Sequence, residues 1–199
     1  MKTFNWILTG LILVLSTGIV SAKTNVQKAT FGIYEISNKS EIPGSLIDLM
    51  KTKNIKFNEN VQSQAVGYLL VEDSAKIKMD LSSENLKMIK TVYPVDNSKK
   101  HFEFAVLKIV PAISLSDIQI TKNKGNKVEI YFTLSGARKW ADFTKKNIGK
   151  MVAFVIDNQI YTMPLVQAEI RSGEAIIVGL KDEKMAENIS VYLNSSLLK

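Results

Sequence analysis

The sequence predicts an α+β fold, in which a largely antiparallel or mixed sheet carries helices packed on one face. Three observations support this class. Apolar and polar residues alternate strictly over residues 128–134, as in a half-buried strand. Asp157-Asn158 has the composition of a two-residue hairpin turn. Apolar residues recur at helical spacing behind Ser135 and Asp182, so amphipathic helices are interleaved with the strands.

The N-terminal segment has the pattern of a secretory signal peptide. Lys2 forms a short basic region and is followed by an apolar run over residues 7–20. This run of about 14 residues is shorter than the roughly 20 that span hydrocarbon. Residues 20–22, Val-Ser-Ala, supply the small-x-small pattern that a signal peptidase reads. We therefore expect residues 1–22 to be a signal peptide.

The same segment predicts where the protein resides. We expect the mature chain to be exported, to the periplasm or out of the cell, with no membrane span beyond the signal peptide. The alternative is an uncleaved N-terminal helix that anchors the chain. No cysteine follows the apolar run, so a lipid anchor is excluded.

Composition excludes several classes of function. The 199 residues include no cysteine, which excludes disulfide frameworks, thiolate metal sites and cysteine nucleophiles. His101 is the single histidine, so ligands for a zinc centre are too few, and we expect no metal or other cofactor. Lys and Arg number 26 against 19 Asp and Glu, but only Arg138 and Arg171 are arginines. Since arginine makes most bidentate contacts with phosphates and bases, we expect no nucleic-acid partner.

Residues 23–110 predict an N-terminal α+β lobe. Their sequence does not indicate a relationship to other proteins. Strands are expected at residues 29–36, 65–71 and 101–110, the last with apolar side chains on both faces. One helix is expected to begin near Pro43 and another behind Ser82, which resembles an N-cap. The apolar stripes of these helices are Leu46, Leu49 and Met50 in the first, and Leu86, Ile89 and Tyr93 in the second.

Residues 111–199 predict a second α+β lobe. The turn at residues 124–126, Lys-Gly-Asn, is expected to join a strand at residues 118–121 to the alternating strand described above. Ser135 is expected to cap a helix that ends at Asn147 and Gly149, because glycine accepts the left-handed conformation. The buried face of this helix is expected to consist of Ala137, Trp140, Ala141 and Ile148.

The rest of this lobe predicts two hairpins and a final helix. Residues 151–156 are apolar on both faces and are expected to form a central strand that turns into residues 159–163. Pro164 lacks an N–H, so this second strand must bend, bulge or lie at a sheet edge. The turn at Ser172-Gly173 is expected to join residues 166–170 to residues 175–178. Asp182 is expected to cap a helix bearing Met185, Ala186, Ile189 and Leu193.

The polar loop at residues 96–100 carries only a weak boundary signal, and we do not divide the chain there. We expect one two-lobed unit rather than two independent domains. The oligomeric state does not follow from the sequence.

No catalytic site is expected. The sequence contains no Gly-x-Gly-x-x-Gly, Walker or Gly-x-Ser-x-Gly motif, and its adjacent acidic pairs do not provide opposed carboxylates. An enzymatic function would require a compact cluster in the folded protein, such as Glu129, Asp142 and His101 in one pocket.

Several short motifs in residues 136–179 resemble one family. They are Gly-Ala-Arg-Lys-Trp at residues 136–140, Phe-Thr-Lys-Lys-Asn-Ile-Gly-Lys at 143–150, Phe-Val-Ile-Asp-Asn at 154–158, Tyr-Thr-Met-Pro at 161–164 and Ile-Arg-Ser-Gly-Glu-Ala at 170–175. In this order they are similar to the head lobe of the first periplasmic domain of the SecD/SecDF protein-export subunits. Weaker similarity reaches from about residue 113 to about residue 193, under half of the mature chain.

The resemblance implies a function in protein export. In full-length relatives such a head is connected to a membrane bundle and is thought to engage emerging polypeptide. Since no membrane bundle is expected here, we expect a stand-alone, noncatalytic binding module for polypeptide or envelope proteins, with Sec translocase components as possible partners. The alternative is a structural or interaction protein of the envelope that kept the fold without a transport role.

The family motifs predict two groups of residues. Most are expected to be structural: Gly136, Trp140, Thr144, Asn147, Gly149, Asp157, Pro164 and Gly173. A protein-contact surface is expected at Tyr161, Met163 and Pro164, because Tyr is amphipathic and Met adapts to varied apolar segments. The strand edge beside Pro164 is also expected to accept an extended chain by strand addition on its unblocked stretch.

Overall fold

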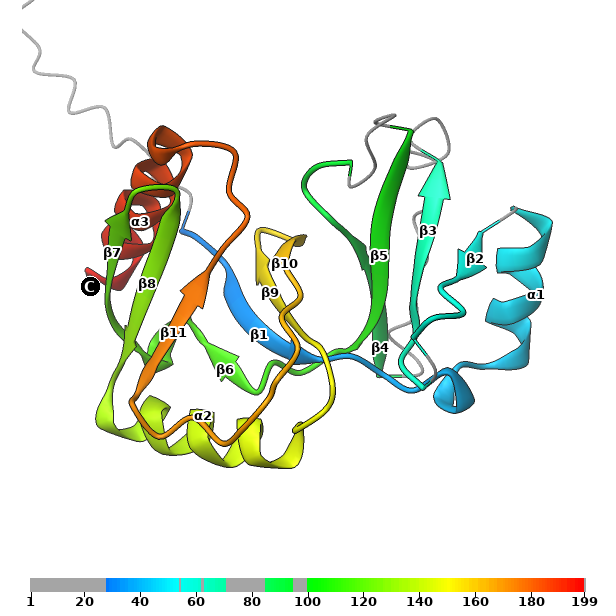
Figure 1. Cartoon of the computed structure of the whole chain (residues 1–199), viewed down its shortest axis with the longest axis horizontal. Helices are drawn as coiled ribbons and strands as arrows, with labels where there is room; N and C mark the ends of the chain where they lie inside the picture. The colour runs from blue at the N-terminus through cyan, green and yellow to red at the C-terminus, as the bar shows by residue number, and fades with distance from the viewer. Residues whose placement is uncertain (1–27, 54, 62, 71–84, 95–99, 199) are drawn as a thin grey trace, which may run out of the picture.

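The computed structural model describes residues 28–53, 55–61, 63–70, 85–94 and 100–198. It shows an α+β protein with three antiparallel sheets and three α-helices in this part of the chain (Figure 1). The predicted fold class is confirmed. The predicted signal peptide and Ser82 lie outside the described residues.

The first sheet, here called the central sheet, has the order β10-β9-β1-β6. Its strands are β1 (Phe31–Glu35), β6 (Ile113–Ser114), β9 (Val152–Ile156) and β10 (Gln159–Thr162). All five residues of β9 are buried, as expected for a strand with apolar side chains on both faces.

The second sheet, here called the β8 sheet, has the order β11-β8-β7. It consists of β7 (Ile118–Lys124), β8 (Lys127–Phe132) and β11 (Glu174–Ile177). The 3₁₀ helix η4 (Leu115–Asp117) precedes β7. Two helices, α2 (Leu134–Lys146) and α3 (Glu183–Leu197), bury side chains in the same core as this sheet.

The third sheet, here called the β5 sheet, has the order β2-β3-β5-β4. Its strands are β2 (Lys56–Phe57), β3 (Val66–Leu70), β4 (Leu86–Lys90) and β5 (His101–Lys108). The 3₁₀ helix η1 (Lys39–Glu41) and α1 (Gly44–Thr52) lie between β1 and β2 along the chain. Figure 1 shows the three sheets side by side, with the central sheet between the other two.

Alternation along two strands divides the core into three clusters. On β9, Phe154 packs with the β8 sheet, α2 and α3, whereas Val155 faces the β5 sheet. On β5, Leu107 faces the central sheet, whereas Phe104 packs with α1. Each strand therefore serves two layers, because successive side chains point to opposite faces.

The two halves of the chain share the central sheet. β1 comes from the N-terminal half but pairs with β9 and β6 of the C-terminal half. Gln64 adds a two-way link, since its amide donates to the Met151 carbonyl at 2.8 Å and accepts from the Met151 N–H at 2.7 Å. These links join the halves, while the predicted lobe boundary at residue 110 stays a prediction.

Two predicted helical features of residues 23–110 are wrong. Leu86 and Ile89 lie on strand β4, where they are buried beside β5, and Tyr93 follows β4 in no helix. Leu49 is exposed, because only Leu46 and Met50 of α1 face the core.

The cap and the face of α2 also differ from the prediction. Thr133, not Ser135, caps the helix, since its hydroxyl accepts from the Gly136 N–H at 3.0 Å. Ile148 is 51% exposed, because the chain leaves the helix at Asn147 before the helical period returns to the core.

One predicted hairpin is also wrong. β11 pairs with β8, not with residues 166–170, which form no named strand. The turn at Gly173 is present, with a φ of 76°, but it leads the chain from residues 166–170 into β11 at the edge of the β8 sheet.

The other hairpin is confirmed. Asp157 and Asn158 have φ values of 46° and 60°, as a two-residue primed turn requires. The pairing of β10 with β9 shifts between Ile160 and Thr162, and β10 lies at the edge of the central sheet, which is where Pro164 is tolerated. Asp182 caps α3 by accepting from the Met185 N–H at 2.8 Å, as predicted.

Candidate functional site

Trp140 organises the core beneath the β8 sheet. Its ring lies 5.7 Å from that of Phe132 and 6.1 Å from those of Phe143 and Phe154, measured between centroids. The contact with Phe154 is edge-on, a favoured geometry for aromatic pairs. α2 is thereby fixed against both the β8 sheet and the central sheet.

Two hydrogen bonds attach residues 170–174, which lead into β11, to α2. The indole Nε1 of Trp140 donates to the Glu174 carbonyl at 2.9 Å. The Thr144 hydroxyl donates to the Trp140 carbonyl and accepts from the Ile170 N–H, both at 2.9 Å. These bonds hold residues 170–174 against the helix.

Two glycines allow the close approaches that this arrangement needs. A Cβ on Gly136 would lie about 2.3 Å from the Asp117 carbonyl oxygen, so α2 begins directly against the end of η4. Gly173 combines its positive φ with a Cβ position only 3.1 Å from the Ala137 side chain. A larger residue at either position would push α2 away from the β8 sheet.

The segment after β10 forms the opposite wall. The Val152 N–H donates to the Pro164 carbonyl at 3.1 Å, and the Val166 N–H donates to the Lys150 carbonyl at 2.9 Å. Gly149, with a φ of 79°, donates its N–H to the Val166 carbonyl at 2.8 Å. Residues 164–166 thus lie alongside residues 150–152, where β9 begins.

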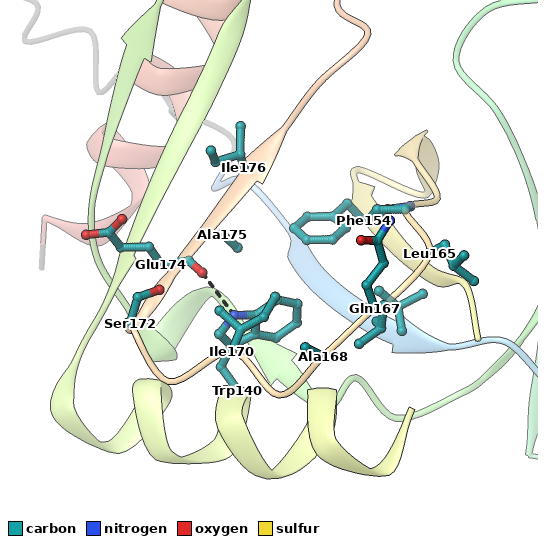
Figure 2. A pocket seen from close by; sticks show the side chains of 13 residues that line it. Trp140, Phe154, Leu165, Gln167, Ala168, Ile170, Ser172, Glu174, Ala175 and Ile176 are labelled. Carbon is teal, nitrogen blue, oxygen red and sulfur yellow. Dashed lines mark hydrogen bonds between the residues drawn. The ribbon is translucent and has the colours of Figure 1, made fainter. Parts of the chain in front are cut away.

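Between these walls lies a hollow of about 490 Å³ (Figure 2). Trp140 and Phe154 lie deep within it, β11 forms one side, and the segment from Pro164 to Ile170 forms the other. Its lining residues are Trp140, Val152, Phe154, Pro164, Leu165, Val166, Gln167, Ala168, Ile170, Ser172, Glu174, Ala175 and Ile176. The lining is mostly apolar, as is typical of binding sites.

Glu174 is the one charged residue in this lining. Its side chain points away from Trp140, on the outer face of β11 (Figure 2). Within the part of the chain that the structure describes, its carboxylate forms no ion pair, whereas the nearby Glu169 accepts from Arg171 at 2.8 and 3.0 Å. The Arg171 hydrogen bonds lower the pKa of Glu169. The rim of the hollow therefore carries an uncompensated negative charge at β11.

A second hollow of about 500 Å³ lies beside α2 and is more polar. Its lining includes Lys108, Lys139 and Lys146. Lys108 pairs with Glu41 at 2.8 Å and Lys139 with Asp117 at 2.7 Å, so two of these charges already have partners within the fold.

The predicted contact residues do not form one surface. Tyr161 packs against the core of the β8 sheet, and Met163 packs against the cluster between the central and β5 sheets. Pro164 alone of the three lines the apolar hollow. Burial raises the pKa of the half-buried Tyr161, as expected for a phenol removed from water. Their role in protein contact stays a prediction.

The edge of β10 is partly covered. The Val92 N–H donates to the Ile160 carbonyl at 2.9 Å, on the side of β10 that faces away from β9. The stretch around Ile160 is therefore already paired within the chain, and strand addition there is blocked.

The residues that would indicate an enzyme lie on three separate elements. Glu129 is on β8, Asp142 on α2 and His101 on β5. Glu129 accepts from the Tyr131 hydroxyl at 2.9 Å, and this hydrogen bond lowers its pKa. Among the described residues, no group of three or more His, Asp or Glu side chains is arranged to hold a metal ion.

Sequence reasoning identified Trp140 and Pro164 but missed most of the hollow. Leu165 lies outside the predicted strands, and Ala168 and Ile176 lie in strands predicted at residues 166–170 and 175–178, so no pattern marks the three as lining one hollow. The sequence predicts that Ile176 pairs within a local hairpin, and this prediction does not indicate its position at the edge of the β8 sheet. The only available signal was the concentration of apolar residues in a segment without regular structure.

The fold and the hollow define an α+β head module with an apolar site between two sheets. Residues 90–199 match the family model described as the SecDF P1 head subdomain. This match covers more than half of the chain, which therefore belongs to the SecDF P1 head family. It begins at Lys90, the last residue of β4, further towards the N-terminus than the motifs alone indicated.

The curated relatives are protein translocase subunits. Over 72 residues the chain is 39% identical to the SecDF subunit of Thermus thermophilus, which covers 36% of this chain and 10% of the relative. Over 86 residues it is 35% identical to SecD of Rhodothermus marinus, covering 42% of this chain and 14% of the relative. The chain thus spans only a small part of the length of these relatives.

Solved structures of SecDF are also similar. One, described as a membrane component that enhances protein export, has a TM-score of 0.49 and 19% identity over 86% of this chain and 65% of that chain. Another, of SecDF in a super-membrane-facing form, has a TM-score of 0.48 and 18% identity over 85% of this chain and 19% of that chain. Among the described residues, no helix combines the length and apolar character needed to cross a bilayer.

Proposed function

We propose that this chain is an exported, noncatalytic module of protein export that holds extended, unfolded polypeptide in the hollow beside β11. The observation that supports this most strongly is the hollow itself, whose lining is mostly apolar and includes Trp140 and Pro164 of the family motifs. Its proposed location is the periplasm or the cell exterior, and its proposed partners are translocating polypeptide and Sec translocase components.

The chemistry of the lining supports a polypeptide ligand. Aromatic rings at Trp140 and Phe154 and aliphatic side chains at Leu165 and Ile176 offer contact without a fixed hydrogen-bonding pattern. Leu165 and Ile176 are 55% and 46% exposed, so both are accessible at the rim. Such a surface suits varied apolar segments better than one defined small molecule.

Site-specific photo-crosslinking tests this function. A photoreactive residue at position 165, at the rim of the hollow, is expected to form adducts with an unfolded polypeptide added to the full chain. A matched probe at Val191, which is 62% exposed on α3, is expected to form none. Equal yields at the two positions, or none at either, would contradict the proposed binding.

The same experiment in cell-envelope extracts distinguishes the alternative function. An envelope interaction protein without a transport role would give adducts with one discrete folded partner and none with unfolded polypeptide. The proposed function requires adducts with many polypeptides, because the hollow selects apolar character rather than one sequence.

A further inference from the structure

The two edges of the β8 sheet differ in how their main-chain groups are satisfied. Along an antiparallel pair, alternate residues direct both their N–H and C=O groups to the neighbouring strand. The Phe132 N–H donates to the Gly173 carbonyl at 3.0 Å, which sets this alternation for β11. Ala175 and Ile177 therefore bond to β8, and Glu174 and Ile176 direct their main-chain groups away from it.

The outward groups of β11 face the hollow. Figure 2 shows the Glu174 carbonyl directed to Trp140, whose indole N–H satisfies it. Within the part of the chain that the structure describes, no protein group reaches the outward N–H and C=O of Ile176. β11 is thus an open sheet edge in the wall of an apolar hollow.

At the opposite edge, a side chain satisfies the outward main-chain groups of one residue of β7. By the same alternation Thr121 of β7 directs its main-chain groups outward, and the amide of Asn194 satisfies both of them. Asn194 accepts from the Thr121 N–H at 2.8 Å and donates to the Thr121 carbonyl at 2.9 Å. The side-chain amide thereby takes the place that a further strand would occupy.

We propose that the open edge of β11 receives an extended polypeptide as a fourth strand of the β8 sheet, with apolar side chains entering the hollow and a Lys or Arg beside Glu174. This inference rests on the proposed function and specifies how the polypeptide is recognised. The Ile176 N–H and C=O supply the main-chain pairing.

The two faces of β11 determine the pattern of the bound segment. Ala175 is buried and faces the core, so added side chains on that face project towards Trp140 and Phe154. Glu174 and Ile176 lie on the outer face, where the unpaired Glu174 carboxylate favours a cation. Since alternate residues of a strand share a face, the occupant alternates apolar and polar residues and carries a basic one on the polar face.

Peptide binding to the full chain tests this inference. The probe is a capped peptide of about nine residues that alternates Val with Ser and carries one Lys among the Ser positions. Replacing Trp6 by Phe leaves Trp140, at the hollow, as the only tryptophan, so its fluorescence reports occupancy.

Variants at Ile176 separate main-chain from side-chain recognition. Ile176→Pro removes the outward N–H and is expected to weaken binding about tenfold, whereas Ile176→Ala keeps the N–H and is expected to weaken it about threefold or less. The matched control is Asn123→Pro on β7, another outward N–H remote from the hollow, which is expected to leave binding unchanged.

A charge variant tests the basic position. Glu174→Gln is expected to weaken binding of the Lys peptide about threefold, and this difference is expected to disappear at high salt. A peptide with Glu in place of Lys is expected to bind more weakly to the unmodified chain and equally to the variant.

The outcomes distinguish this inference from the proposed function. Equal binding by Ile176→Pro and Ile176→Ala would overturn strand addition while leaving polypeptide binding intact. No binding of the peptide or of unfolded polypeptide to the unmodified chain would overturn both. A dimer in sedimentation that Ile176→Pro dissociates would assign the edge to a second copy of the chain and overturn the proposal.

Discussion

The two edges of the β8 sheet differ: β7 is closed by a side chain at Thr121, whereas β11 is open at Ile176. At β7 the Asn194 amide satisfies the outward main-chain groups of Thr121, and the Thr121 hydroxyl also bonds to the Ser190 carbonyl at 3.1 Å. At β11 the outward groups of Ile176 face a hollow instead. Open edges are sites of unwanted association, and proteins usually cover them. We therefore propose that the β7 edge contributes to stability and the β11 edge to binding.

The largest expected effect on stability is a difference between proline substitutions at two neighbouring residues of β11. Ile177→Pro removes an N–H that bonds to β8 and a buried side chain, so it is expected to lower the free energy of unfolding by about 3 kcal/mol or more. Ile176→Pro removes an outward N–H and is expected to cost less than about 1 kcal/mol. Urea unfolding of both variants measures the difference. Equal losses would contradict the assigned alternation.

Opening the closed edge is expected to have the next largest effect. Asn194→Ala leaves the Thr121 N–H and C=O without protein partners in a partly buried place, and a loss of about 2 kcal/mol in total is expected. Denaturant unfolding measures the loss. Asn188→Ala, on the exposed face of the same helix, is the control and is expected to change stability by less than about 0.5 kcal/mol. Similar values for both variants would show that the amide does not close the edge.

The stability contributed by Asp117, which immediately precedes β7, is expected to depend on pH. Burial raises the pKa of Asp117, but hydrogen bonds from Lys139 and Ser114 outweigh this and hold the pKa below its ordinary value. A lowered pKa in the folded state contributes stability above the unfolded value, and this contribution is lost as the pH falls through both values. Asp117→Asn is therefore expected to be less stable by about 1–2 kcal/mol at pH 7.

Unfolding measured from pH 7 to about pH 3 checks this prediction. The difference between Asp117→Asn and the unmodified chain is expected to shrink as the pH falls. A constant difference across this range would show that the carboxylate charge is not its source.

The smallest expected effect is at the open edge. Trp140→Phe keeps an aromatic ring but removes the N–H that bonds to the Glu174 carbonyl, so a loss of about 1 kcal/mol is expected. The freed carbonyl adds an acceptor on the outward side of β11. Peptide binding, measured by calorimetry because the tryptophan is absent, is expected to weaken about threefold or less, because the phenyl ring still lines the hollow but offers a smaller contact area. Complete loss of binding would show that the indole N–H itself contacts the ligand.

Much of the fold follows from local patterns in the sequence. The strict alternation in β8, the Asp157-Asn158 turn and the Asp182 cap each depend on neighbouring residues, and each was predicted correctly. The apolar spacing at Leu86 fits both the helix and the strand period, and the sequence alone predicts a helix there. Pairing with β5 decides in favour of a strand, and that contact is not local.

The candidate site could be predicted only in part. Trp140 and Pro164 were identified through the family motifs, but the open edge arises because β11 joins β8 across about 45 residues of sequence. The turn at Gly173 is equally compatible with a local hairpin and with this longer connection. No local pattern indicates which strand Ile176 meets, so neither the hollow nor its edge could be derived from the sequence alone.

Hydrogen exchange at the Ile176 amide tests the central claim most directly. The account predicts that adding the alternating Val/Ser peptide slows exchange of the Ile176 N–H, while exchange of the Thr121 N–H at the closed edge is unchanged. If the peptide is bound but exchange slows at neither amide, strand addition at β11 is contradicted. Equal slowing at both amides would contradict it as well.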